Sequence, residues 1–202
     1  MRWLFLIVQF CLLYVGNANA VIIDLNSRVN DLNNPVNLNL DAGTYNIDPI
    51  GTADGGLYNA WNAWGITTCT DPAGCPRTSP TTVVGWLNVY SFGSADLTNV
   101  FINGVAATPS SGDIYYVDPF LAYPDPLSAL ADAWSAQFTL NTASVVTVSF
   151  AIPDRPLSDN VGGMSLRVDA TSAPEPPTIA LMGLGLVGIG IGYKRQRSKK
   201  AG

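Results

Sequence analysis

One short loop holds the side chains best suited to bind a metal ion. It contains Asp154, Asp159 and Asn160, and Gly162 and Gly163 follow closely. Calcium takes about six to eight oxygen ligands, many of them from carboxylates and amides. Glycine permits the tight backbone turns that bring such oxygens together. The pattern therefore indicates a calcium site, although Asp and Asn also occur in loops because they stabilise turns by bonding their own backbone.

The elements that must position this loop have the pattern of β-strands. Residues 143–152 precede it and residues 164–168 follow it, and apolar and polar side chains alternate in both segments. Alternation with period two is typical of a strand that buries one face. We therefore expect the two segments to form a hairpin that carries the candidate loop at its turn.

The chain from residue 21 to residue 169 continues in the same way. Residues 36–40 and 44–47 alternate on either side of the turn Asp41–Gly43, which predicts a second hairpin. Further strands are expected at residues 21–25, 82–92, 114–117 and 136–140.

One segment of this region is expected to be helical. It spans residues 125–134, where Asp125 is a suitable N-cap and Pro126 suits the first helical position. Many short strands separated by Gly, Asn and Pro turns are typical of a sandwich. The prediction is an all-β, jelly-roll-like β-sandwich domain over residues 21–169 with one short helix.

The charge of this domain limits its partners and its chemistry. It holds 14 Asp and four Arg but no Glu or Lys, so its net charge is −10. Nucleic acid is therefore not an expected partner. The chain has no His, which excludes Ser-His-Asp catalysis and zinc sites built on His. We expect no enzymatic activity, although a pair of carboxylates would allow a glycoside hydrolase-like alternative.

Two cysteines and two tryptophans mark the segment after the second predicted hairpin. Cys69 and Cys75 form an even pair, which predicts a disulfide if the chain is exported. Trp61 and Trp64 lie in a loop rich in Gly and Asn. Exposed aromatic rings there suit carbohydrate binding, and burial in the core is the equal alternative. Trp86 and Tyr90, at strand spacing, are expected to face inward.

The first 20 residues have the three parts of a secretory signal peptide. Arg2 is followed by an apolar run and then by the small-residue step Ala18-Asn19-Ala20. We expect a signal helix over residues 1–20 with cleavage after Ala20. A retained membrane anchor is the alternative, but the apolar run is short for a span of ~20 residues.

The other end of the chain has a second sorting pattern. Residues 170–177 form a linker with the sequence Pro174-Glu175-Pro176, and residues 178–193 form an apolar segment that predicts a transmembrane helix. Residues 194–202 are basic, which places them in the cytoplasm. A signal peptide at one end and a cytoplasmic tail at the other agree on one topology.

This tail resembles the PEP-CTERM sorting signal. In that family an exosortase-type membrane protease recognises the Pro-Glu-Pro motif, and the hosts are Gram-negative bacteria that make exopolysaccharide. The resemblance implies a precursor held in the inner membrane and facing the periplasm. It then implies delivery to the cell surface or the extracellular matrix.

The core resembles the calcium-dependent, galactose-binding bacterial lectins of jelly-roll fold. The resemblance covers an aromatic loop from residue 58 to residue 65, the Cys69–Cys75 loop and the closing loop from residue 154 to residue 163. It implies that Asp154, Asp159 and Asn160 bind calcium and that Tyr58 adds a backbone carbonyl. The closing loop is two residues shorter than in that family, Asp159 stands where the family has Asn, and the His that contacts sugar there is absent.

These observations predict an exported, non-enzymatic protein of the cell envelope or extracellular matrix. Its domain is expected to bind calcium and, through Trp61 and Trp64, exopolysaccharide. A purely structural surface protein without a ligand is the main alternative.

Overall fold

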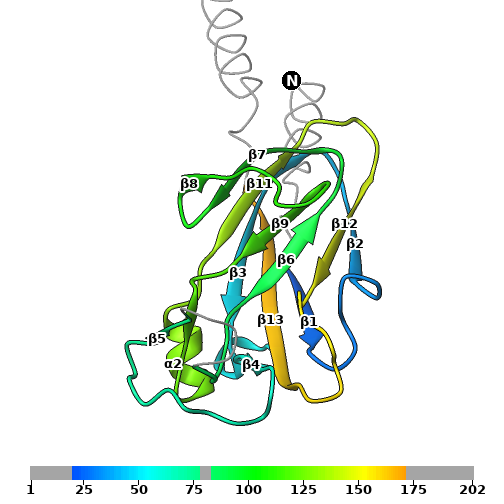
Figure 1. The fold of residues 1–202 in the computed structure, drawn as a ribbon. Helices are drawn as coiled ribbons and strands as arrows, with labels where there is room; N and C mark the ends of the chain where they lie inside the picture. Colours follow the sequence, from blue (N-terminus) through cyan, green and yellow to red (C-terminus); the bar gives the residue numbers. More distant parts are fainter. Residues whose placement is uncertain (1–19, 78–82, 172–202) are drawn as a thin grey trace, which may run out of the picture. The chain divides into compact units, whose positions relative to one another are not determined.

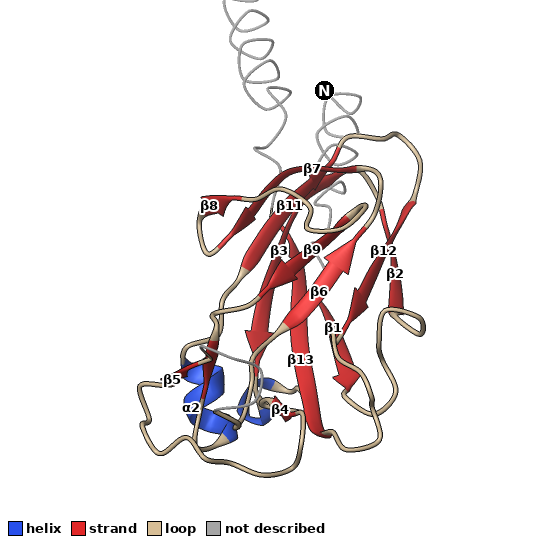
Figure 2. Ribbon diagram, in the orientation of Figure 1, coloured by secondary structure: helices blue, strands red, loops and turns tan. Residues whose placement is uncertain are grey.

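The computed structural model describes residues 20–77 and 83–171, and Figures 1 and 2 show two layers of antiparallel strands. The larger sheet holds β1 (Val21–Asn26), β3 (Gly43–Ile50), β7 (Leu97–Ile102), β8 (Val105–Ala106), β11 (Ala136–Leu140) and β13 (Val161–Ala170). The smaller sheet holds β2 (Val36–Leu40), β6 (Tyr90–Gly93), β9 (Ile114–Val117) and β12 (Val146–Ala151). Three shorter strands are β4 (Trp61–Asn62), which joins β13, and the pair β5 (Cys75–Pro76) and β10 (Leu121–Ala122).

The strand order is that of a jelly roll. One sheet runs β1-β13-β3-β11 and continues into the β7–β8 hairpin, and the other runs β2-β12-β6-β9. The chain thus alternates between layers, as it does in two interlocked Greek keys. The predicted all-β sandwich is confirmed.

The core lies between the two layers. Phe138 of the larger sheet meets Phe92 of the smaller one with ring centroids 5.9 Å apart, and Phe92 also stacks on Tyr115. Phe138 and Phe150 are fully buried from opposite sheets. Burial of such rings contributes most of the stabilisation of a fold of this kind.

Both predicted hairpins are wrong. β2 pairs with β12, whereas β3 pairs with β11 and β13, so the turn Asp41–Gly43 crosses between the sheets. β12 and β13 also lie in different sheets. Alternation shows that a strand buries one face, but it does not say which strand lies beside it.

The remaining expectations have mixed outcomes. Asp125 caps helix α2 (Pro126–Ala131) through the amides of Leu127 and Ser128, but the helix ends three residues before Trp134. The expected strand over residues 82–92 is regular only from Tyr90; before it, among the residues described, isolated bridges join Leu87 to Trp61 and Trp86 to Tyr123. A 3-10 turn, η1 (Thr52–Asp54), was not expected.

The predicted signal helix and transmembrane helix lie outside the described residues, apart from Ala20. Within residues 20–77 and 83–171, no helix is long and apolar enough to cross a membrane. β1 begins at Val21, which pairs with Val168 near the end of β13. Both ends of the described domain therefore lie at one end of the sandwich (Figure 1).

Candidate metal centre

The candidate loop crosses from β12 to β13 at the end of the sandwich away from Val21 (Figure 1). β13 has ten residues, and at ~3.3 Å per residue it separates the loop from Ala170 by roughly 30 Å. Short strands and turns gather at this same end, including β4, β5 and helix α2. The loop is thus presented on the side opposite to the domain's two ends.

The structure brings Asp154, Asp159 and Asn160 together. The Asp154 carboxyl interacts with the side-chain amide of Asn160 and is repelled by the negative charge of Asp159. Burial raises its pKa, the Asn160 amide lowers it, and the Asp159 charge raises it, so that the pKa of Asp154 lies above its usual value. A cation beside these groups would offset both the cost of burying the Asp154 charge and its repulsion by Asp159.

Two oxygens at this place lack a partner in the protein. Oδ1 of Asp159 and Oδ1 of Asn160 are buried, and neither accepts a hydrogen bond within the residues described. The Asn160 side chain is fully buried and donates from Nδ2 to the carbonyl of Ser27 at 2.9 Å. A buried polar atom without a partner costs about 1–3 kcal/mol. The unused oxygens therefore need a ligand such as a metal ion or an ordered water.

The loop between β1 and β2 supports the candidate loop along its length. Ser27 donates from N and Oγ to the carbonyl of Gly162, and Arg28 Nε donates to the carbonyl of Asn160 at 2.5 Å. Ile152 N donates to the carbonyl of Asn30 at 2.8 Å. These contacts hold both ends of the candidate loop in place.

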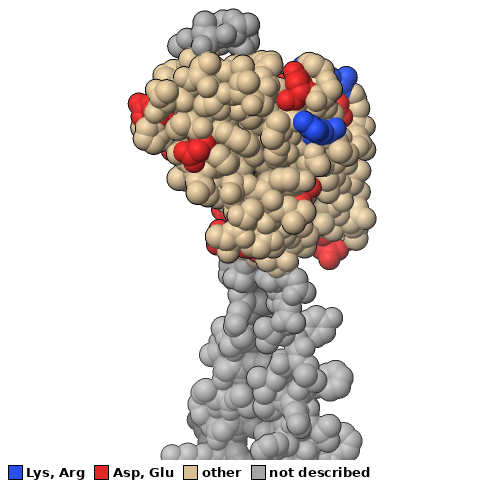
Figure 3. All heavy atoms as spheres, turned by 90° about the horizontal axis from the view of Figure 1, so that it is seen from below, with Lys and Arg blue, Asp and Glu red and all other residues tan. Residues whose placement is uncertain are grey.

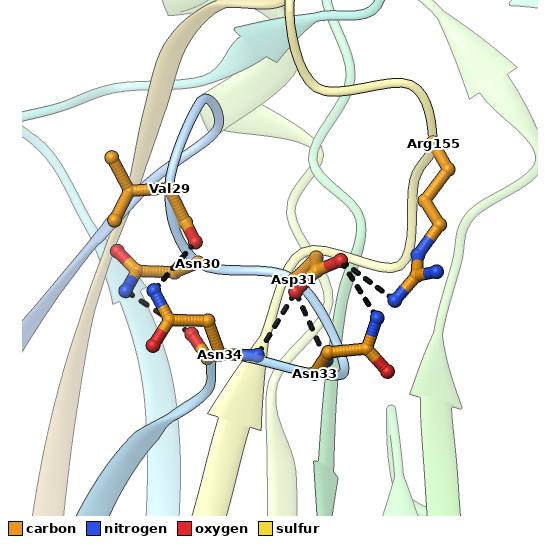
Figure 4. A network of polar contacts seen from close by, with 6 residues as sticks. All are labelled: Val29, Asn30, Asp31, Asn33, Asn34 and Arg155. Carbon is orange, nitrogen blue, oxygen red and sulfur yellow. Dashed lines mark hydrogen bonds and ion pairs between the residues drawn. The ribbon is translucent and has the colours of Figure 1, made fainter.

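An ion pair adds to this support. Figure 4 shows Asp31 between Arg155 and two backbone amides of its own loop. The Arg155 guanidinium lies 2.9 Å from Asp31 Oδ2, and the amides of Asn33 and Asn34 donate to Asp31 Oδ1 at 2.9 Å. Asp31 is thus held by its own loop, and it in turn holds Arg155, the residue that follows Asp154.

Tyr58 lies beside the start of β13. A Cβ placed on Gly163 would come within 2.7 Å of the Tyr58 ring and 2.2 Å of the Leu25 carbonyl. Gly163 N also donates to the carbonyl of Ala60 at 3.2 Å. Glycine at position 163 thus allows the Tyr58 segment to approach the strand that follows Asn160.

The carboxylates alone do not make a metal cluster. Among the residues described, no group of three or more Cys, Asp or Glu side chains has a spacing that would hold an ion. The candidate centre instead combines two carboxylates with one amide oxygen. Backbone carbonyls and water would have to complete the shell that calcium needs.

The two candidate aromatic residues differ in exposure. Trp61 is only 3% exposed and donates from Nε1 to the carbonyl of Val89 at 2.9 Å, so it is a core residue. The expectation that it stacks on a sugar is corrected, because β4 pairs Trp61 with Gly162 of β13 and turns the ring inward. Trp64 is 47% exposed, and its amide donates to Asn62 Oδ1 at 3.0 Å. Tyr90 is buried, and Trp86 is partly buried.

Trp64 lies close to the candidate centre. A Cβ on the next residue, Gly65, would come within 3.2 Å of the Val161 side chain and 4.0 Å of the Asp159 carbonyl. A groove of about 650 Å³ runs beside it, and its lining includes Trp64 and Asp154. Trp64 is therefore the predicted aromatic residue that faces solvent next to the loop.

The small cysteine loop supports another part of the groove. Cys69 and Cys75 are joined by a disulfide, and Cys75 pairs with Ala122 across β5 and β10. Two residues later, Arg77 forms an ion pair with Asp118. Sequence reasoning missed this pair, because nothing in the local pattern of either residue indicates the other.

Comparison with known proteins identifies one part of the chain. A model of the PEP-CTERM protein-sorting motif matches residues 172–196, which include Pro174-Glu175-Pro176. The tail is a PEP-CTERM sorting signal. No curated protein and no solved structure matches the chain.

The PEP-CTERM signal establishes how the protein is handled. It marks an exported protein whose membrane-anchored precursor is a substrate of exosortase and is processed for the cell surface. The matched residues lie outside those that the structure describes. What the domain does at the surface has to be argued from its own geometry.

Proposed function

We propose that this PEP-CTERM protein is a non-enzymatic surface protein whose sandwich domain binds calcium and, beside the ion, carbohydrate. The observation that carries the proposal is the pair of buried, unpartnered Oδ1 atoms on Asp159 and Asn160 next to the Asp154 carboxyl. Hydrogen-bond donors for them are absent among the described residues, and oxygen is the donor atom that calcium prefers.

The charges at the site favour a divalent cation. Asp154 and Asp159 bring two negative charges close together, which is unfavourable unless a cation lies between them. In our proposal Asp154, Asp159 and Asn160 hold the ion through their side chains. The resemblance to bacterial lectins adds the backbone carbonyl of Tyr58, which lies in the segment packed on Gly163.

The proposal extends to the ligand and the address of the protein. The exposed ring of Trp64 next to the loop supports a carbohydrate partner, and exopolysaccharide is the expected one for a surface protein. The precursor is proposed to stay in the inner membrane, facing the periplasm of a Gram-negative bacterium, until exosortase acts. The protein then reaches the cell surface or the extracellular matrix.

Calorimetric titration of the purified full-length chain with calcium tests the metal site. We expect one ion to bind to the wild type and no binding to the double variant Asp154→Asn, Asp159→Asn. Asp96→Asn is the matched control, since Asp96 is an exposed aspartate in a turn outside the site. Equal calcium binding by the double variant and the wild type, or none by either, would contradict the proposal. A domain without any ligand would give the second result.

A further inference from the structure

The groove beside the candidate loop has charged and aromatic residues from several parts of the chain. Its lining includes Trp64, Arg77, Asp118, Phe120, Asp154 and Arg155. Its volume of about 650 Å³ is in the range of sites that hold small ligands or a few sugar units. Figure 3, which views the domain from this end, shows its basic side chains on one side with acidic side chains beside them.

Phe120 is held in a conformation that its side chain disfavours. Its φ is +60°, which places a bulky residue in the left-handed region, and its side chain is 66% exposed. The Phe120 amide donates to Asp118 Oδ1 at 2.7 Å, and Arg77 N donates to the Phe120 carbonyl at 3.0 Å. Strain of this kind persists where the surroundings fix it, and it concentrates at ligand sites.

The exposed ring of Phe120 contributes little to the stability of the fold. An apolar side chain stabilises a protein when it is buried, and Phe120 is mostly in water. Trp64, also exposed, lines the same groove. Two exposed aromatic rings at one groove provide flat surfaces on which the apolar face of a sugar ring can pack.

The charges of the groove point to the kind of sugar. The domain has only four arginines, and two of them, Arg77 and Arg155, line this groove. Their acidic neighbours are already engaged: Asp118 pairs with Arg77, and Asp31 pairs with Arg155. The remaining carboxylate, Asp154, belongs to the proposed calcium site. Arg77, Arg155 and a bound calcium ion together balance the charges of Asp118, Asp31, Asp154 and Asp159. With the ion bound, the groove is therefore neutral, although the domain as a whole carries a net charge of −10.

We propose that this groove binds an acidic polysaccharide. Arg77, Arg155 and the calcium ion meet its carboxylates, and Phe120 and Trp64 pack on its sugar rings. Arginine suits this role because its planar guanidinium binds carboxylates through two parallel hydrogen bonds, and each of these arginines has further N–H groups beyond its ion pair. The inference rests on the proposed calcium site and names the ligand class of that site.

Binding of short oligogalacturonides and of neutral maltooligosaccharides to the purified full-length chain, with calcium or with EGTA, tests this inference. We expect the wild type to bind the acidic sugar with calcium, and EGTA and the neutral sugar to abolish binding. Phe120→Gly suits the left-handed backbone and keeps the fold, so it should bind about tenfold more weakly while calcium binding is unchanged. Arg155→Gln should weaken binding to a similar extent.

Matched controls separate the groove from the rest of the surface. Arg167→Gln removes the arginine of β13 that pairs with Asp48 and Asp169, and Phe101→Ala removes a partly exposed ring of β7. Both should bind like the wild type. Calcium binding without oligogalacturonide binding, or equal binding by Phe120→Gly and the wild type, would overturn the acidic-sugar inference alone. Failure of calcium to bind would overturn the calcium site as well.

Discussion

Asn160 donates its side-chain amide to the carbonyl of Ser27 at 2.9 Å, while its Oδ1 lies buried without a partner. The hydrogen bond joins two loops 133 residues apart and fixes the orientation of the amide. The same amide group lies against the Asp154 carboxyl, and Oδ1 of Asp159 is likewise buried without a partner among the residues described. This relationship is the basis of the calcium proposal.

Replacement of Asp154 by Asn should have opposite effects with and without calcium. Burial and the charge of Asp159 raise the pKa of Asp154, so its ionised form destabilises the calcium-free fold at neutral pH. In EGTA, Asp154→Asn should melt at or above the wild-type temperature. In calcium it should melt below the wild type, because it loses a ligand. Thermal unfolding of both proteins under both conditions checks this, and the same order in both conditions would count against a metal at this place.

Replacement of Gly163 by Ala should destabilise the fold strongly. The new Cβ would lie 2.2 Å from the Leu25 carbonyl and 2.7 Å from the Tyr58 ring. Overpacking of this kind costs about 1–3 kcal/mol or more. Gly104→Ala is the control, since nothing lies within 4 Å of its Cβ and only its positive φ of +76° adds a cost of about 1 kcal/mol. Equal unfolding free energies for the two variants in urea would refute the close approach of Tyr58.

Acid should weaken the contribution of the α2 cap. The Ser128 hydroxyl and backbone amides donate to Asp125 and lower its pKa below the usual value. The hydrogen bonds that lower the Asp125 pKa stabilise the fold at pH values above the pKa of this carboxyl in the unfolded chain. That stabilisation is lost as the pH falls through its pKa in the folded protein. The difference in melting temperature between wild type and Asp125→Ala should therefore shrink below about pH 4. A difference that is constant from neutral to acid would contradict the role of the ionised carboxylate.

The sorting tail should control maturation. Substitution of Pro174-Glu175-Pro176 by alanines removes the motif within residues 172–196. We expect the unprocessed precursor to accumulate in the membrane fraction and the processed form to disappear, as judged by immunoblot. Exchange of Pro153 for Ala, outside the tail, is the control. Normal processing of the alanine variant would contradict recognition of the motif by exosortase.

Local patterns predicted the elements better than their partners. The strand at Ala136–Leu140 and the cap at Asp125 follow from neighbouring residues, and the structure confirms both. The hairpin predicted around the turn Asp41–Gly43 was wrong, because alternation indicates only which face of a strand is buried. The strand that pairs with it lies far along the chain. β2 thus pairs with β12, more than 100 residues later.

The candidate site was predictable to a similar degree. Three oxygen-bearing side chains in one loop indicated the centre, and the PEP-CTERM motif was visible in the sequence. The burial of Trp61 and the exposure of Trp64 were not predictable, because they depend on the pairing of β4 with β13. Phe120 was missed because the neighbouring residues indicate neither its left-handed backbone nor its exposure.

Thermal unfolding of the wild type in calcium and in EGTA tests the central claim most directly, with Asn160→Ala beside it. At a calcium concentration about 100 times the dissociation constant, binding adds about 2.7 kcal/mol, which raises the melting temperature by roughly 5 to 10 °C. The account predicts this rise for the wild type and little or none for Asn160→Ala. An identical melting temperature for the wild type in calcium and in EGTA would contradict it.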